Sequence, residues 1–182
     1  MNKKIVMPFA AAALAFAMTA AVAKDPMVGG AAMFETKNIV QNAVNSADHT
    51  TLVAAVKAAG LVETLESPGP FTVFAPTNEA FQKLPEGTVD TLLQPANLDQ
   101  LKSVLTYHVV SGRISAKDLM NMIKEGNGTA TLKTVNGEPL WAMMHGGKIA
   151  LKDQKGNMAH ISISNVYQSN GVIHVIDTVL MP

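Results

Sequence analysis

Six side chains in the second half of the chain offer sulfur or imidazole to a metal ion: Met120, Met122, Met143, Met144, His145 and Met158. Thioether and imidazole groups together suit Cu(I). The alternative is that methionine fills irregular cores and adaptable surfaces. Met143 and Met144 are adjacent, so in a strand they point to opposite faces and do not share one site. We therefore expect no metal centre, and copper held by Met143 and His145 is the weaker alternative.

A Tyr-His pair, Tyr107-His108, is followed by the apolar residues Val109 and Val110. Tyrosine combines apolar area with a polar tip and suits contact surfaces, so these four residues are candidate adhesion contacts. At the end of a helix, however, such a pair more often holds loops in place through hydrogen bonds. We favour this structural interpretation.

A second candidate contact patch contains Trp141, Met143 and Met144. Tryptophan and methionine are enriched in the centres of protein interfaces. The alternative is that these side chains pack between two sheets. His174 lies in an apolar run, and we expect it to be a core histidine with hydrogen-bond partners.

The sequence carries no recognisable catalytic motif. The run Val109-Val110-Ser111-Gly112-Arg113 lacks the first glycine of a nucleophile elbow, and neither an H-E-x-x-H motif nor a phosphate-binding glycine loop occurs. The absence of cysteine excludes disulfides and a thiol nucleophile. We expect a protein that is not an enzyme and uses no cofactor.

The N-terminus has the three parts of a secretory signal peptide. Lys3 and Lys4 supply positive charge, residues 5–20 are apolar and rich in alanine, and Ala21-Val22-Ala23 is a cleavage signal. We expect residues 1–23 to be removed and the product to be periplasmic or secreted, without a transmembrane anchor. The remaining 159 residues carry 12 basic and 14 acidic side chains, a balance that does not favour nucleic acid.

The elements that position these side chains form a helical half followed by a strand-rich half. Aromatic and β-branched residues alternate over 71–75, which predicts a strand that ends at Pro76 before a helix capped by Thr77. Helical spacing covers 38–59, 88–93, 97–106 and 115–126. Turn signals at 136–137, 146–147, 156–157 and 170–171 then separate runs of strand length. The pattern predicts one α+β domain preceded by a flexible leader at residues 24–35.

Three blocks of this sequence resemble the fasciclin (FAS1) domain, in the order found in that family. They are residues 71–81, the Tyr107-His108 pair, and the closing block that begins at Asn170. The resemblance covers residues 36–182 and implies a wedge-shaped antiparallel β-sandwich with helices packed on it. The structural signature of the family falls on Phe71, Phe74, Pro76, Thr77, Asn78, Phe81, Asn170, Gly171, His174 and Asp177.

The resemblance also implies a non-enzymatic module that adheres to a cell-surface or extracellular protein or a polysaccharide. In animal members the Tyr-His pair is linked to integrin adhesion, which corresponds to Tyr107 and His108 here. The bacterial type of signal peptide argues against integrin as the native partner. The run around Trp141 departs from the family pattern, which favours smaller or β-branched residues there. We predict an exported adhesion or binding module, with a periplasmic Met/His copper-binding protein as the alternative.

Overall fold

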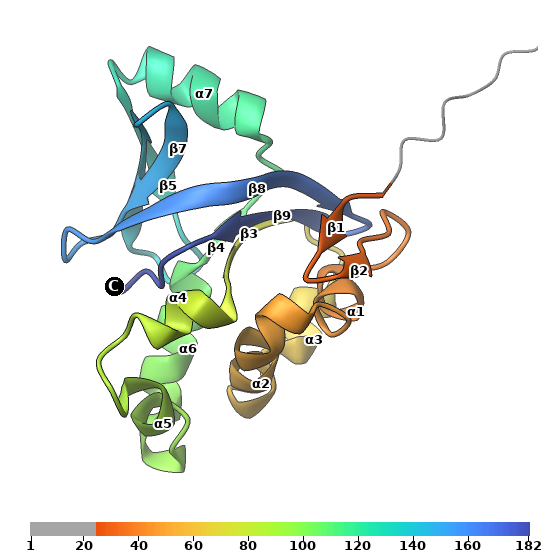
Figure 1. Cartoon of the computed structure of the whole chain (residues 1–182). Coiled ribbons are helices and arrows are strands. Elements are labelled where there is room, and N and C mark those ends of the chain that lie inside the picture. The colour runs from red at the N-terminus through yellow and green to blue at the C-terminus, as the bar shows by residue number, and fades with distance from the viewer. Residues whose placement is uncertain (1–24) are drawn as a thin grey trace, which may run out of the picture.

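The computed structural model describes residues 25–182, and the expected signal peptide, residues 1–23, lies outside the described residues. Most helices precede residue 110, as the sequence predicts. The helices are α1 (Ile39–Ala43), α2 (Thr50–Ala58), α3 (Val62–Glu66), α4 (Asn78–Gln82), α5 (Thr88–Leu92), α6 (Leu98–Tyr107) and α7 (Ala116–Glu125), with 3₁₀ turns η1 (Ala47–His49) and η2 (Pro95–Asn97) (Figure 1). Between residues 25 and 182, none of the helices has the length and apolar character needed to cross a bilayer.

Seven strands form one bent sheet. They are β3 (Phe71–Pro76), β4 (Val109–Ser111), β5 (Thr129–Lys133), β6 (Pro139–His145), β7 (Lys148–Lys152), β8 (Met158–Gln168) and β9 (Gly171–Ile176), in the spatial order β4-β3-β9-β8-β7-β6-β5. Neighbouring strands are antiparallel except β3 and β9, which run parallel. β9 is buried along its whole length, as expected for a central strand.

β8 connects the two halves of this sheet. Its residues 158–160 pair with β7, whereas residues 161–168 pair with β9. The β8–β9 register shifts between Ile161 and Ile163 and again between Ile163 and Val166. Such irregularities bend and twist a strand. The β5–β7 end therefore turns away from β3, β4 and β9, as Figure 1 shows.

The turns between the later strands lie where the sequence predicts them. Each of the four predicted turn signals separates two strands of the sheet. The Gly146-Gly147 turn has positive φ at both residues, 58° and 79°, which a two-residue hairpin of this type requires. It places His145 opposite Lys148 and sets the register of β6 on β7.

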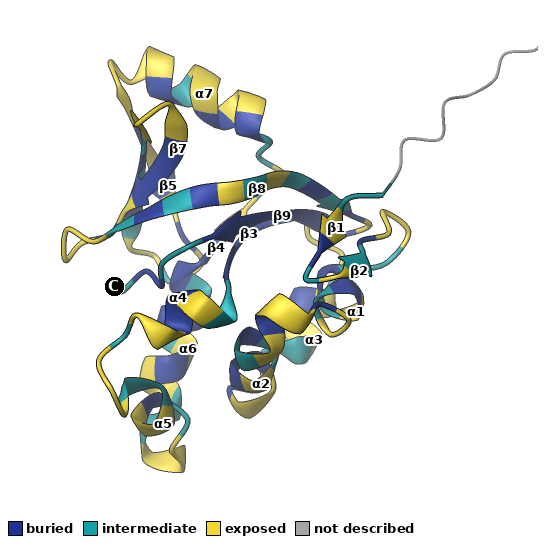
Figure 2. Cartoon of the chain, in the orientation of Figure 1, coloured by how far each residue is buried: buried dark blue, intermediate teal, exposed yellow. Residues whose placement is uncertain are grey.

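Two hydrophobic clusters lie on opposite faces of β3. Val73 and Ala75 belong to the cluster that contains α1 to α6, whereas Phe74 belongs to the cluster between α7 and strands β5 to β8. This is the alternation expected of a strand buried on both faces. Figure 2 shows the buried stripe on each of these helices and the buried central strands.

The N-terminal segment differs from the flexible leader that we expected. β1 (Met27–Val28) and β2 (Ala31–Ala32) form a hairpin, and Val28 and Met33 are buried in the cluster with α1 to α3. The Gly29-Gly30 turn makes the hairpin possible because both glycines have positive φ. Ordered structure therefore begins before residue 36.

Candidate functional site

The four candidate adhesion contacts lie inside the protein. Tyr107 is 0% exposed, His108 2%, Val109 6% and Val110 3%. Tyr107 ends α6 and Val109 begins β4, so these four residues lie where the helix meets the sheet. The folded domain presents no surface at these residues, so the candidate contact role does not hold for them, and their burial agrees with the structural interpretation favoured from the sequence.

Tyr107 connects α6 to the start of β6. Its hydroxyl donates to the Pro139 carbonyl oxygen at 2.8 Å, while its ring packs in the cluster beneath α7. Burial raises the pKa of the Tyr107 hydroxyl to about 12, and the nearby carboxylates of Asp153 and Glu138 act in the same direction. The hydroxyl therefore remains a neutral donor.

His108 connects α6 to the C-terminal segment. The amide of Leu180 donates to His108 Nε2 at 3.0 Å, so Nδ1 carries the proton and donates to the Val104 carbonyl at 2.8 Å. Both ring nitrogens are thus satisfied in one neutral tautomer. Burial lowers the pKa of His108 from 6.5 to about 4.

Two asparagines of the predicted signature join elements that are distant in the sequence. Asn170 Oδ1 accepts from the Ile39 amide at the start of α1, and Asn170 Nδ2 donates to the Leu65 and Ser67 carbonyls at the end of α3. Asn78 Oδ1 accepts from the Thr51 amide in the first turn of α2. These contacts satisfy the free backbone groups of helix ends.

The other signature residues have structural positions too. Phe74 stacks on His174 at 5.7 Å between ring centroids, and His174 Nε2 donates to the Ile114 carbonyl while Nδ1 accepts from the Asn165 amide. Thr77 accepts from the Ala80 amide as the N-cap of α4. The remaining members are Phe71 and Pro76 in β3, Gly171 in β9, Asp177 directly after β9, and Phe81 in α4.

The candidate patch around Trp141 lies on the outer face of β5 to β8. Trp141 and Met143 share this face with Thr129 and Lys152, and both are half-buried. They line a shallow open hollow that is completed by the β7–β8 turn, residues 153–156. Met144 is 47% exposed but lies on the opposite face of β6, so it is not part of this patch.

The candidate metal ligands are only partly brought together. Met120 and Met122 lie on α7, and Met144 faces away from Met143. Within residues 25–182, no group of three His, Cys, Asp or Glu side chains converges as a metal site would require. Met143 and His145 do share the outer face of β6, because they are two residues apart in one strand.

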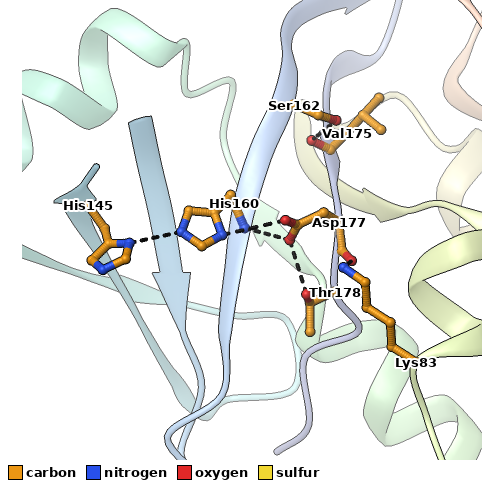
Figure 3. Close-up of polar contacts among 7 residues, drawn as sticks. All are labelled: Lys83, His145, His160, Ser162, Val175, Asp177 and Thr178. Atoms are coloured by element: carbon orange, nitrogen blue, oxygen red, sulfur yellow. Dashed lines mark hydrogen bonds and ion pairs between the residues drawn. The ribbon is translucent and has the colours of Figure 1, made fainter. Parts of the chain in front are cut away.

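Sequence reasoning missed His160, which lies beside His145 in the structure. The two rings approach with His145 Nδ1 at 3.0 Å from His160 Nε2 (Figure 3). The only available signal was the registers of two successive hairpins, since β7 lies between the two histidines. Ala150 of β7 pairs with Met143 on one side and with His160 on the other, so one row crosses three strands.

Asp177 completes this group. Its Oδ1 accepts from the His160 amide at 2.8 Å and from the Thr178 hydroxyl at 3.0 Å, and its Oδ2 lies 3.5 Å from His160 Nδ1. Partial burial opposes ionisation, but these hydrogen bonds, Lys83 and His160 outweigh it and hold the pKa of Asp177 below its ordinary value.

A small apolar cavity lies between β3 and helices α1 to α3. Its volume is about 70 Å³, and its lining includes Val28, Met33, Leu52 and His49, whose Nε2 has no hydrogen-bond partner among residues 25–182. A cavity that holds a benzene-sized ligand has about 150 Å³. We therefore assign this space to imperfect packing and not to a ligand site.

Residues 47–182 match the family described as Fasciclin domain. The chain belongs to the fasciclin domain family. The predicted resemblance and the predicted α+β fold are both confirmed. Fasciclin domains are cell adhesion modules, and the family is an adhesion-type, non-enzymatic one.

The similar proteins include bacterial and animal chains. Protein sll1483 of Synechocystis is 45% identical over 159 residues, which cover 87% of this chain and 81% of that protein. The immunogenic protein MPB70 of Mycobacterium bovis is 35% identical over 191 residues, covering 94% and 90% of the two chains. Transforming growth factor-beta-induced protein ig-h3 of Sus scrofa is 40% identical over 140 residues, covering 72% of this chain and 17% of that one.

The fold is that of a solved fasciclin structure. The FAS1 domain pair of the insect cell adhesion molecule Fasciclin I superposes with a TM-score of 0.71 at 20% sequence identity. The match covers 80% of this fasciclin domain chain and 51% of that domain pair. At this identity the similarity concerns the fold alone.

Proposed function

We propose that this fasciclin domain is an exported adhesion or binding module that contacts a cell-surface or extracellular protein or a polysaccharide. Export is supported by the charged, apolar and A-x-A segments of residues 1–23. Surface function is supported by the relatives, which include the cell surface glycolipoprotein MPB83 of Mycobacterium bovis.

The outer face of β5 to β8 is the contact surface that we propose. The observation that carries this choice is the half-buried pair Trp141 and Met143 beside an open hollow. The inner face of the same strands packs under α7, so its apolar side chains are already used. Lys152 and Gln154 at the hollow supply polar groups around the apolar centre, which is the usual composition of a contact site.

The test compares binding by variants of opposite faces of β6. Purified chain is incubated with intact cells of the source organism, with their surface protein fraction and with their surface polysaccharide fraction. We expect Trp141→Ala and Met143→Ala to weaken retention on one of these fractions at least about tenfold, as loss of an interface anchor does. Met144→Ala is the matched control, because it removes an equally large side chain from the other face.

The single tryptophan gives a second readout. When the wild-type chain binds through this face, the tryptophan emission should shift in wavelength or become protected from quenching by acrylamide. Binding that Trp141→Ala leaves unchanged, in a folded variant, contradicts the proposed surface. A failure of the wild-type chain to bind any of the three preparations contradicts the adhesion function itself.

A further inference from the structure

We propose that the open hollow beside Trp141 binds an acidic polysaccharide, with a sugar ring stacked on Trp141 and sugar carboxylates paired with Lys152 and Lys155. This inference rests on the proposed adhesion function, because it uses the same outer face of β5 to β8 and names the chemistry of its partner. Of the two classes of partner proposed above, it selects polysaccharide.

Trp141 has a polar neighbour on each side. The registers of the two hairpins place Thr131 of β5 and Lys152 of β7 directly opposite it. Side chains that lie opposite each other on one face of an antiparallel pair have Cβ atoms about 4.5–5.5 Å apart. Thr131 and Lys152 are both exposed, and Trp141 is half-buried. A ring that lies over the indole is therefore within reach of a hydroxyl on one side and of an ammonium group on the other.

The hollow has the size and the mixed lining of a site for sugar rings. Its volume is about 490 Å³, within the range of about 300–1,000 Å³ that is usual for ligand sites. Trp141 and Met143 supply apolar lining, whereas Thr129 and Gln154 supply groups that form hydrogen bonds. The C–H groups on one face of a pyranose ring pack well on an indole, because the face of an aromatic ring carries partial negative charge. The hollow is open, so a polymer can continue beyond it.

The charge of this part of the chain favours an anionic partner. Residues 129–168 carry four lysines and two carboxylates, whereas residues 25–128 carry seven basic and eleven acidic side chains. The four lysines lie on the outer face or at the hollow: Lys133, Lys148, Lys152 and Lys155. All four are exposed, and within residues 25–182 none of them forms an ion pair with a carboxylate.

The carboxylates near these lysines already have partners. Asp153 is 1% exposed, and its two oxygens accept from three donors of the chain. Glu138 Oε2 accepts from Gln154 Nε2 at 2.6 Å. Asp177, farther along the sheet, lies beside His160. The lysines are therefore left to pair with carboxylates from outside the chain.

Other partners fit this face less well. Lysine is depleted in the centres of protein interfaces, whereas here Lys152 lies directly beside Trp141. Side chains that enter a bilayer surface have to reach into it, but Trp141 and Met143 are half-buried and line a hollow. Single-stranded nucleic acid is bound by successive aromatic side chains, and Trp141 is the one aromatic residue that the described part of the chain places in the hollow.

The test titrates the full purified chain with polygalacturonate and with alginate, which are polymers of uronic acids, and with their methyl esters. The esters keep the sugar rings and lose the charge. Calorimetry should show at least one polyuronate bound at least about tenfold more tightly than its ester, because the ester forms no ion pairs with Lys152 and Lys155. The emission of Trp141 should shift in the same titration. Single-stranded DNA and vesicles that contain phosphatidylglycerol are the competing anionic probes.

Variants of the hollow identify the groups that bind. Trp141→Ala should weaken polyuronate binding at least about tenfold, as loss of an interface anchor does. Lys152→Gln/Lys155→Gln should weaken it about fivefold or more and should make it less sensitive to salt. Lys117→Gln/Lys124→Gln is the matched control, because it removes two exposed charges from α7, which covers the opposite face of these strands (Figure 1). This control should bind as the wild type does.

The proposal is overturned if neither polyuronate binds, if the methyl esters bind equally well, or if DNA or the vesicles bind more tightly. It is also overturned if Trp141→Ala, with the melting temperature of the wild type, keeps full polyuronate affinity. The adhesion function survives these results when the surface protein fraction retains the wild-type chain and releases Trp141→Ala. Failure of the wild-type chain to bind any of the three cell preparations is instead the failure of the adhesion function.

Discussion

Individual side chains that looked available for recognition instead hold the fasciclin domain together. Tyr107 and His108 each make one hydrogen bond to a segment more than 30 residues away in the sequence, to Pro139 and Leu180. Their residue types left both roles open, because tyrosine and histidine suit an interface and an interior, and only their position at a helix end favoured the structural role. What decided their role was the burial of both.

The buried histidines predict that acid destabilises this domain. His108 has a pKa of about 4 when folded and 6.5 when unfolded, so between these values the unfolded chain binds more protons. The contribution of His108 is therefore complete above about pH 6.5 and is lost as the pH falls toward 4, about 3 kcal/mol in all. Burial lowers the pKa of His49 and His174 as well, which adds to the loss.

Urea unfolding at pH 7.5, 5.5 and 4.5 measures this effect, and NMR titration of the His108 ring identifies its source. The free energy of unfolding should fall at each step. A His108 ring that titrates near its ordinary pKa, together with equal stability at the three values, would contradict the prediction.

Helix ends in this domain depend on side chains from other elements. Asn170, in the β8–β9 turn, caps α1 and closes α3, although these helices lie more than 100 residues earlier. Asn170→Ala leaves the buried Ile39 amide and Leu65 carbonyl without partners. We expect a loss of about 3 kcal/mol in the free energy of unfolding, since each unsatisfied buried group costs about 1–3 kcal/mol.

Chemical denaturation of Asn170→Ala beside Asn121→Ala measures this loss. Asn121 is exposed on α7, so its replacement by alanine should change stability by less than about 0.5 kcal/mol. Equal stability of the two variants would show that the hydrogen bonds of Asn170 add nothing measurable to the free energy of unfolding.

The C-terminal segment holds the two parts of the whole molecule together. Val179 lies in the cluster with α1 to α6, whereas Leu180 lies in the cluster under α7. The Leu180 amide donates to His108, and the Met181 amide donates to Asp153 in the β7–β8 turn. A chain that ends at Thr178 loses two buried aliphatic side chains and both contacts.

We expect this truncation to lower the free energy of unfolding by more than about 3 kcal/mol, because burial of each aliphatic side chain contributes about 1.5–3 kcal/mol. Urea denaturation followed by near-UV and far-UV circular dichroism measures it. The two signals should change together in the wild-type chain, because β8 and the C-terminal segment join both cores. A truncated chain with wild-type stability would show that the segment only rests on the surface.

The amino-acid sequence alone was enough to predict the α+β class, the family, the central strands and the four turns of the second half. These features depend on local signals: alternation along a strand, proline and glycine at turns, and caps at helix starts. It was also enough to separate Met143 from Met144, since adjacent residues of a strand face opposite ways. The ordered hairpin at 27–32 was missed because its strands have two residues each.

The tertiary structure alone decided which side chains face solvent and which meet. Tyr107 and His108 became interior groups because α6 runs directly into the sheet. His145 and His160 became neighbours because two hairpin registers place them on one face with a small alanine between. Contacts between strands that are not adjacent in the chain depend on the register of every strand between them, and a shift of one residue would turn a whole strand over.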